Sequence, residues 1–209
     1  IVTSSTWKQS SSASTRLRNQ GLAIDSDNRL LWKMSRRKLE AESVRDSVLA
    51  LSGKLNLTMY GPGYRDFVLK SPEHSPHYEY HLHDPDDPAT HRRSIYRFVV
   101  RSQLEPFMNT LDCADPSILV GRRNNGVTPL QSLTMLNSGL MVTMSSHFAS
   151  KLETEYAEPT EQVRQAFYRA VGRLPNKDEH RVLLDVAREH GLDNACRLIF
   201  NLNEFSFID

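Results

Sequence analysis

Two arginine doublets, Arg92-Arg93 and Arg122-Arg123, stand on either side of two aspartates, Asp112 and Asp115. A guanidinium group is costly to bury unless carboxylates or carbonyls surround it. The doublets therefore indicate either a fixed polar network inside the fold or a surface that faces an anion. Because successive side chains of an extended segment alternate between faces, one arginine of each doublet should point inward. We expect at least one of them to pair with Asp112 or Asp115 and the others to face solvent.

The two aspartates flank Cys113 and precede Pro116. Paired carboxylates can act as general acid and base. An aspartate before a proline is also typical of a turn, in which its side chain accepts backbone hydrogen bonds. A structural network, a ligand-binding site and a catalytic pair therefore stay open for this segment, and the structural network is the favoured interpretation. The candidate binding residues are Arg92, Arg93, Asp112, Asp115, Arg122 and Arg123.

Histidines and carboxylates gather between residues 71 and 91. Imidazoles and carboxylates at this density can ligate zinc or another divalent metal. The motifs that place two imidazoles on one helix face need an uninterrupted helix, and the prolines of this segment forbid it. The sequence therefore predicts a solvated, poorly ordered polar loop without a preformed metal site. The histidines are His74, His77, His81, His83 and His91, and the prolines are Pro72, Pro76, Pro85 and Pro88.

Other local motifs of catalysis or cofactor binding are missing from the sequence. It holds no Gly-x-Ser-x-Gly and no glycine loop that could cradle phosphates. It also lacks Cys-x-x-Cys, so it predicts no zinc knuckle and no c-type haem attachment within this chain. The two cysteines, Cys113 and Cys196, are far apart, and either a disulfide or two buried free thiols would fit, with free thiols favoured.

Composition describes an ordinary globular protein of 209 residues, with 39% hydrophobic and 24% charged residues. The 26 basic and 25 acidic residues give a net charge of +1, which argues against a nucleic-acid-binding domain. No apolar run approaches the roughly 20 residues that span a bilayer. The chain starts with Ile1-Val2-Thr3, which resembles the interior of an element rather than a natural start. We therefore expect one domain over residues 1–209, truncated at its N-terminus, with any targeting signal upstream.

The N-terminal part is predicted to hold one long helix. Residues 1–28 are rich in serine and threonine and indicate a short element followed by a loop. From Asn28, apolar residues recur at threes and fours until Gly53, which is typical of a helix and its end. Charged residues along this segment are expected to form a solvated face. They are Arg36, Arg37, Lys38, Glu40, Glu42, Arg45 and Asp46.

A small β element is expected in the middle of the chain. Residues 65–70 and 94–101 are rich in β-forming side chains, and glycines and prolines separate them. The pattern predicts an antiparallel pair of strands joined by a long irregular loop.

Strong helix signals begin at Thr128, a capping residue followed by Pro129. An interruption at residues 137–139 predicts a bend. Later helices are expected to begin after Thr160, Asn176 and Asp193. The sequence therefore predicts a mainly α protein, with a helical bundle over about 128–209, a small antiparallel β element and long irregular loops. The side chains expected to be buried in the bundle are Leu133, Phe167, Leu183 and Ile199.

The order of several segments resembles one family over nearly the whole chain. It is similar to the C-terminal planctomycete-specific domain of unknown function found in large secreted proteins with a cytochrome-c-like module upstream. Trp7 replaces the tyrosine usual in that family, and residues 122–128 depart from its threonine-rich form. The segments that carry the resemblance are Ile1–Ser11, Asn28–Trp32, Arg36–Glu42, His91–Tyr96, Leu111–Ser117, Pro129–Leu133, Leu136-Asn137, Ala166–Arg173 and Asn201–Phe205.

The resemblance implies an extracytoplasmic or secreted, multidomain protein. The partners it implies are the upstream domains of the same polypeptide and glycans; nucleic acid and a membrane span are not expected. Haem would belong to another module, so no cofactor is expected in this chain.

Two function classes remain. The first is a non-catalytic scaffold or binding module, and it is favoured because the sequence shows no local catalytic motif. The second is part of a carbohydrate-active, hydrolase-like domain whose site the missing N-terminal part would complete.

Overall fold

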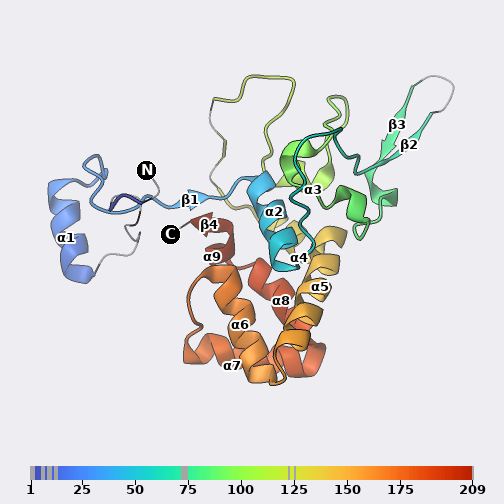
Figure 1. Cartoon of the computed structure of the whole chain (residues 1–209). Helices are drawn as coiled ribbons and strands as arrows, with labels where there is room; N and C mark the ends of the chain where they lie inside the picture. Colours follow the sequence, from blue (N-terminus) through green and yellow to red (C-terminus); the bar gives the residue numbers. More distant parts are fainter. Residues whose placement is uncertain are drawn as a thin grey trace.

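The C-terminal part of the chain folds into a helical bundle, and most other segments gather at one end of it (Figure 1). The computed structural model describes residues 3–5, 8, 11, 14–71, 75–121, 123–124 and 126–208. The mainly helical fold and the C-terminal bundle are confirmed. The bundle consists of α4 (Pro129–Asn137), α5 (Gly139–Glu155), α6 (Pro159–Val171), α7 (Lys177–His190), α8 (Leu192–Phe200) and the short α9 (Asn203–Ser206).

Local capping explains where these helices begin. Thr128 forms a capping box with Gln131 at the start of α4, and Asn176 forms one with Glu179 at the start of α7. Ser138 separates α4 from α5, where the bend was predicted. The expected caps of the other two helices are wrong. Glu158 precedes α6, because its Pro159 suits the first position of a helix, and Gly191 precedes α8.

The core of the bundle lies around α8, which packs against α5, α6 and α7. Phe148 of α5 and Phe200 of α8 stack with ring centroids 5.7 Å apart, and both are fully buried. Phe167, Leu183 and Ile199 are buried as predicted, whereas Leu133 is 54% exposed. The prediction for Leu133 is wrong because α4 lies at the margin of the bundle and turns its Met135 inward instead.

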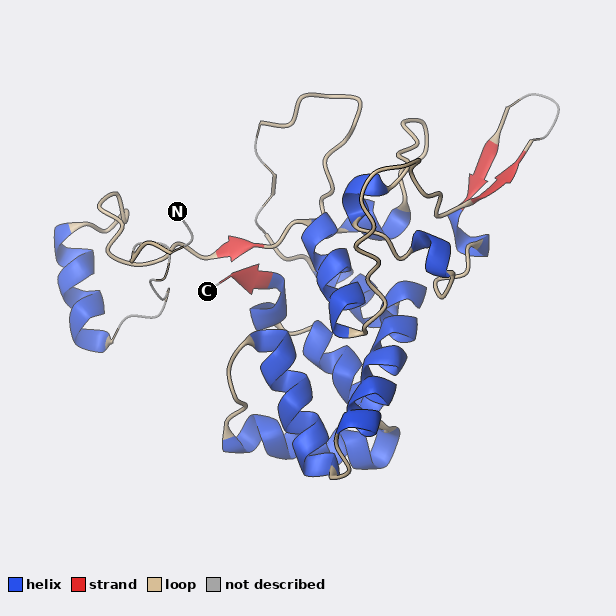
Figure 2. Ribbon diagram, viewed as in Figure 1, coloured by secondary structure: helices blue, strands red, loops and turns tan. Residues whose placement is uncertain are grey.

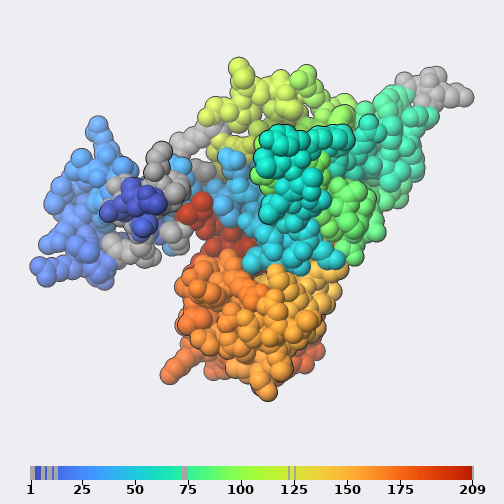
Figure 3. Space-filling model, viewed as in Figure 1, coloured from blue at the N-terminus to red at the C-terminus, as the bar shows by residue number. Residues whose placement is uncertain are grey.

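The N-terminal part differs from the predicted long helix. A helix, α1 (Thr15–Ile24), forms in the segment expected to be a loop, and it buries none of its residues. Residues 28–36 do not form a helix, since Asn28 and Leu31 adopt positive φ angles of 53° and 55°. Only α2 (Ala41–Leu51) forms the predicted helix. Figures 2 and 3 show α1 to one side of the bundle, joined to it through β1 (Arg37–Lys38).

Two small antiparallel sheets complete the fold. β1 pairs with β4 (Phe207–Ile208), which places the end of the chain beside the segment that leads into α2. The second sheet pairs β2 (Val68–Lys70) with β3 (His77–Glu79). The predicted pairing of 65–70 with 94–101 is wrong: residues 94–96 form a short 3-10 helix, η3 (Ser94–Tyr96), and only a single parallel bridge joins Tyr64 to Arg97.

The remaining elements are short and lie between β3 and the bundle. They are the 3-10 helices η1 (Tyr80–Leu82) and η2 (Pro88–Thr90) and the five-residue helix α3 (Pro106–Thr110). The described residues between α3 and α4, which are 111–121, 123–124 and 126–128, form an irregular loop. Among the described helices, none combines the length and the apolar character that crossing a membrane requires.

Candidate functional site

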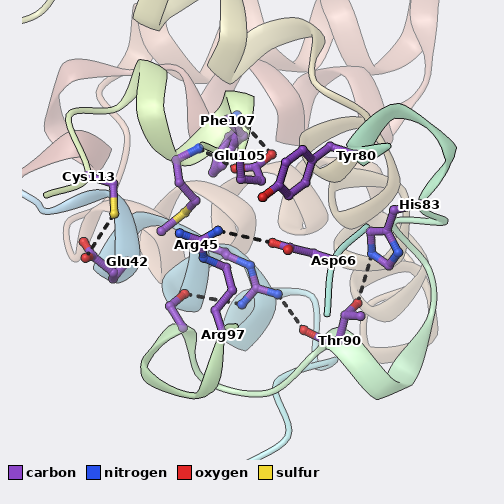
Figure 4. A network of polar contacts seen from close by, with 12 residues as sticks. Glu42, Arg45, Asp66, Tyr80, His83, Thr90, Arg97, Glu105, Phe107 and Cys113 are labelled. Atoms are coloured by element: carbon purple, nitrogen blue, oxygen red, sulfur yellow. Dashed lines mark hydrogen bonds and ion pairs between the residues drawn. The ribbon is translucent and has the colours of Figure 1, made fainter. Parts of the chain in front are cut away.

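A polar cleft of about 300 Å³ opens where α2, α3 and the start of α5 meet Asp66 and the segment 80–90. Segments far apart in the sequence supply its charged and hydroxyl groups, as Figure 4 shows. Part of its wall is apolar, formed by Pro85, Phe107, Met108 and Leu140. The polar lining consists of Arg45, Asp66, Tyr80, His81, His83, Thr90, Glu105 and Ser138.

Arg45 of α2 is buried beneath this cleft, with 5% of its surface exposed. Its Nη2 donates to the carbonyl of Thr90 at 2.6 Å, and its Nη1 donates to the carbonyl of Arg92 at 3.0 Å and to Ser94 Oγ at 3.4 Å. The guanidinium also lies over the ring of Tyr64. Arg45 therefore holds the segment 90–94 against α2. Its charge is compensated by these carbonyls and by the carboxylate of Asp46, whose Oδ1 lies 3.6 Å from Nη1.

Asp66 brings a carboxylate into the cleft. Its Oδ2 lies 3.7 Å from Nη1 of Arg97, whose side chain is 5% exposed. The other oxygen, Oδ1, is buried and has no hydrogen-bond partner. Burial raises the pKa of the Asp66 carboxyl, and the charge of Arg97 opposes that rise. Asp66 thus lines the cleft and contains, in Oδ1, a buried acceptor that the fold leaves unpaired.

In Glu105, in contrast, each carboxylate oxygen already has a hydrogen-bond partner within the fold. Glu105 precedes α3, and its two carboxylate oxygens accept the backbone N–H groups of Phe107 at 3.0 Å and Met108 at 2.6 Å. Burial raises the pKa of Glu105, although these hydrogen bonds act against the rise. The carboxylate caps a helix that begins with Pro106, and that role occupies both of its oxygens.

Hydroxyl and imidazole groups also line the cleft. Tyr80 donates its hydroxyl to the carbonyl of Gln103 at 2.9 Å, and burial raises the pKa of Tyr80 to about 12. His83 Nε2 lies 3.3 Å from Thr90 Oγ1, and that hydroxyl donates to the carbonyl of Asp87. These groups are held in place, so the cleft can present a fixed polar surface to a bound molecule.

The arginines of the first doublet lie elsewhere and pair with neither aspartate. Arg92 donates to the carbonyls of Thr58, Tyr60 and Pro62, and its guanidinium lies 4.0 Å from the ring centroid of Tyr96. Arg93 lies over the same ring, at 5.6 Å. The predicted alternation of faces therefore fails here, because the chain enters η3 at this point and is not an extended strand.

Asp112 pairs with a lysine instead of an arginine. Lys38 Nζ donates to Asp112 Oδ2 at 2.9 Å, to Gln131 Oε1 at 2.9 Å and to the carbonyl of Gly126 at 3.0 Å. Burial would raise the pKa of Asp112, but the hydrogen bonds from Lys38 and Gln131 outweigh it and lower that pKa. The structural-network interpretation therefore holds for Asp112, with a partner that the sequence did not indicate.

Arg123 and Asp115 also have structural roles. Arg123 forms a bidentate pair with Glu42 of α2, at 2.5 and 3.0 Å, and lies 3.4 Å from Glu40. Asp115 accepts the backbone N–H of Ser117 at 2.7 Å, which confirms the turn. Arg122 lies outside the described residues. Asp112 and Arg123 line a second cleft beside β1, far in sequence from Arg92 and Arg93.

Both cysteines are free thiols, as favoured from the sequence. Cys196 is buried in α8, and burial raises its pKa. Cys113 is half-buried and donates to Glu42 Oε1 at 3.4 Å; burial and the charge of Glu42 raise its pKa.

The histidine-rich segment is more structured than predicted, since it holds β3, η1 and η2. His91 is 2% exposed, and its Nε2 lies 3.0 Å from the carbonyl of Pro85. His74 lies outside the described residues. Across the described ranges, no group of three or more histidine, cysteine or carboxylate side chains is arranged to hold a metal ion.

Most residues of the polar cleft were missed because their spacing carries no motif; His81 and His83 were considered only as metal ligands. Arg45 was assigned to a solvated face, yet it lies four residues after Ala41 and three before Val48, within the apolar stripe of α2. That position was the available signal. Asp66, Tyr80 and Glu105 come together only through tertiary contacts, which no local pattern records.

Comparison with known proteins supports a family assignment but no named activity. Residues 1–187 match the family described as PSD1, protein of unknown function (DUF1553). No curated protein and no solved structure matches the chain. Since the match extends over most of the 209 residues, the chain belongs to the PSD1 (DUF1553) family of proteins of unknown function.

Proposed function

We propose that this domain is a non-catalytic binding module of a large extracytoplasmic protein that carries a cytochrome-c-like module upstream. The observation that supports it is the polar cleft, whose side chains are already held by bonds within the chain. Arg45 is held by carbonyls, and Glu105 caps α3. A preorganised surface of this kind suits binding, because ordering its groups requires little further loss of entropy when a ligand arrives.

The ligand class proposed for the module is glycans, and its other partners are the upstream domains of the same polypeptide. A small site with fixed polar groups and an apolar wall is the usual form of a pocket that recognises one ligand orientation. The cleft has both features, with Asp66 and His83 among its polar groups and Phe107 and Leu140 in its apolar wall.

The proposal is tested by adding neutral and acidic oligosaccharides to the full chain and following both binding and product release. Binding is measured by calorimetric titration, and hydrolysis by chromatography of the incubated glycan. We expect saturable binding without cleavage. Failure of every glycan to bind would overturn the binding-module proposal.

The second candidate function is that of a carbohydrate-active, hydrolase-like domain completed by preceding residues. One observation favours it: Asp66 and Glu105 line the same cleft, and burial raises the pKa of both carboxyls. Glycoside hydrolysis commonly uses such a pair, one carboxyl as acid and the other as base or nucleophile. The capping bonds of Glu105 argue against this role, since both of its oxygens are occupied.

Turnover separates the two candidates. If a glycan is cleaved by the full chain, and Glu105→Gln abolishes cleavage while the protein stays folded, the hydrolase is the correct function. Binding with the glycan recovered intact supports the module.

A further inference from the structure

We infer that the polar cleft recognises an uncharged, hydroxyl-rich ring of about the size of one sugar unit, and that Asp66 is the side chain that selects it. This inference rests on the proposed binding function and names the chemical class of its ligand. It departs from the anion-binding surface that the arginine doublets indicated in the sequence.

The first argument is the unused acceptor. Asp66 Oδ1 is buried without a hydrogen-bond partner, while Oδ2 faces Arg97 at 3.7 Å. A buried acceptor left unpaired is unfavourable, so a donor that reaches it gains more than the same donor would gain in water. Rotation about the last torsion of an aspartate is broad and exchanges its two oxygens. The carboxylate can therefore keep one oxygen toward Arg97 and offer the other to a hydroxyl in the cleft.

The second argument is the balance of charge. An anionic ligand would lie beside the carboxylate of Asp66, and Arg45 offers it little, because the Nη atoms of Arg45 already donate to Thr90, Arg92 and Ser94. A cationic ligand would lie close to the buried guanidiniums of Arg45 and Arg97. Each of these already faces one carboxylate, that of Asp46 at 3.6 Å and that of Asp66 at 3.7 Å. Like charges in a partly desolvated site repel strongly. A neutral donor avoids both penalties.

The third argument is shape. The cleft of about 300 Å³ is at the lower end of the range for small-molecule sites. Phe107, Met108 and Leu140 supply an apolar wall, while Asp66, Tyr80 and His83 supply polar groups. Figure 4 shows the carboxylate of Asp66 facing Arg97, with the ring of Tyr80 nearby. A compact ring with C–H groups on its face and hydroxyls on its edge matches this division.

The test uses the full chain and four probes of similar size: glucose, myo-inositol, glucuronate and glucosamine. The first two are neutral rings from different sources, a sugar and a cyclitol, and the others add one negative or one positive charge. Binding is followed by NMR shift titration. We expect a neutral ring to bind about tenfold or more tightly than either charged ring, and the better of the two neutral rings identifies the source.

Two variants locate the site. Asp66→Asn should weaken binding of the neutral ring by about tenfold or more, because a hydrogen bond to a charged acceptor is lost. The matched control, Asp185→Asn, changes an exposed aspartate of α7 and should leave binding unchanged. If Asp66→Asn does not fold, Gly139→Leu tests whether the ligand binds in this cleft. It extends a side chain toward Pro85 at the cleft wall while Asp66 and Arg97 stay intact, and it should abolish binding.

The outcomes separate this inference from the proposed function. Tighter binding of glucuronate or glucosamine would overturn the neutral-ring inference and leave the binding module standing. The inference would also be overturned if the neutral ring binds and neither Asp66→Asn nor Gly139→Leu weakens that binding, since the ligand would then occupy another site. Absence of binding by all four probes, together with absence of binding by oligosaccharides, would overturn both.

Discussion

Lys38 joins three parts of the molecule through one ammonium group. Its side chain is 6% exposed, and it bonds to Asp112, to the carbonyl of Gly126 and to Gln131 of α4. Replacing it by methionine keeps the length of the side chain but leaves Asp112 without its cation. We expect Lys38→Met to lower the free energy of unfolding by about 1–3 kcal/mol, measured by urea unfolding at pH 7.

The matched control for Lys38→Met is Arg181→Met. Arg181 pairs with Asp178 at 3.0 Å, but the two side chains are 70% and 85% exposed. An exposed pair contributes little, so this change should alter stability by less than about 0.5 kcal/mol. Equal effects of the two changes would show that Lys38 does not hold the loop to α4.

A second pair of residues tests the core. Leu152 of α5 is fully buried and Leu133 of α4 is 54% exposed. Leu152→Ala should destabilise the protein by about 2–5 kcal/mol, because it removes buried methyl groups and leaves a cavity. Leu133→Ala should change stability by less than about 1 kcal/mol. Thermal unfolding of both variants measures the difference in stability. A large loss of stability in Leu133→Ala would mean that another surface covers α4.

At the scale of residues, the sequence showed which side chains are charged but not which are buried. Arg123 was expected either to pair with Asp112 or Asp115 or to face solvent, yet it pairs with Glu42, 81 positions away. The partner of an arginine depends on tertiary contacts that no spacing encodes. Arg45 was the exception, since its place among Ala41, Val44 and Val48 could have indicated burial.

The ends of helices allow a test at the scale of elements. Gly172 follows α6 with a φ of 82°, and an added Cβ would meet no atom within 4 Å. Any effect of Gly172→Ala therefore comes from the backbone alone. We expect Gly172→Ala to lower the free energy of unfolding by about 1 kcal/mol, because only glycine adopts this conformation without strain. The measurement is urea unfolding of the variant.

Gly121→Ala is the control for this helix end. An added Cβ at Gly121 also meets nothing within 4 Å, but its φ is not positive. The change should be neutral or slightly stabilising, since it reduces the freedom of the unfolded chain. If Gly121→Ala lowers stability as much as Gly172→Ala does, the positive φ of Gly172 is not the cause of the effect.

Elements with explicit start signals were predicted well. α4 and α7 begin at the capping boxes of Thr128 and Asn176, because these bonds are local and visible in four residues of sequence. The strand expected at 94–101 was wrong. Its β-forming side chains instead accompany η3, whose position is fixed by Asp46 of α2 through bonds to Ser94. A tertiary anchor overrode the local propensity.

At the scale of the whole molecule, the polar cleft could not be predicted. Its groups come from α2, α3, η1, η2, the start of α5 and the loops between them, and they meet only when the middle of the chain packs against the end of the bundle. The bundle itself was predictable, because its apolar stripes repeat with the helical period. The burial of a helix face can be predicted from the spacing of its apolar residues. A site built from segments far apart in the sequence forms only after the helices have packed, so local spacing does not predict it.

The stability of the whole molecule should also depend on pH through the pair that joins α2 to the loop 111–128. Burial would raise the pKa of Glu42, but the hydrogen bonds and charge of Arg123 outweigh it and hold that pKa below its usual value of 4.5. A lowered carboxyl pKa stabilises the fold above the unfolded value and loses that contribution as pH falls through the folded value.

Glu42→Gln should therefore destabilise the protein by about 1 kcal/mol at pH 7 and by less as the pH approaches 3. The measurement is urea unfolding of the wild type and the variant across this range. In an Arg123→Met background, the same substitution should lose most of its pH dependence, because the guanidinium that lowers the pKa is gone. A difference between wild type and variant that stays constant from pH 7 to pH 3, or that persists without Arg123, would show that this ion pair does not link the loop to the helix.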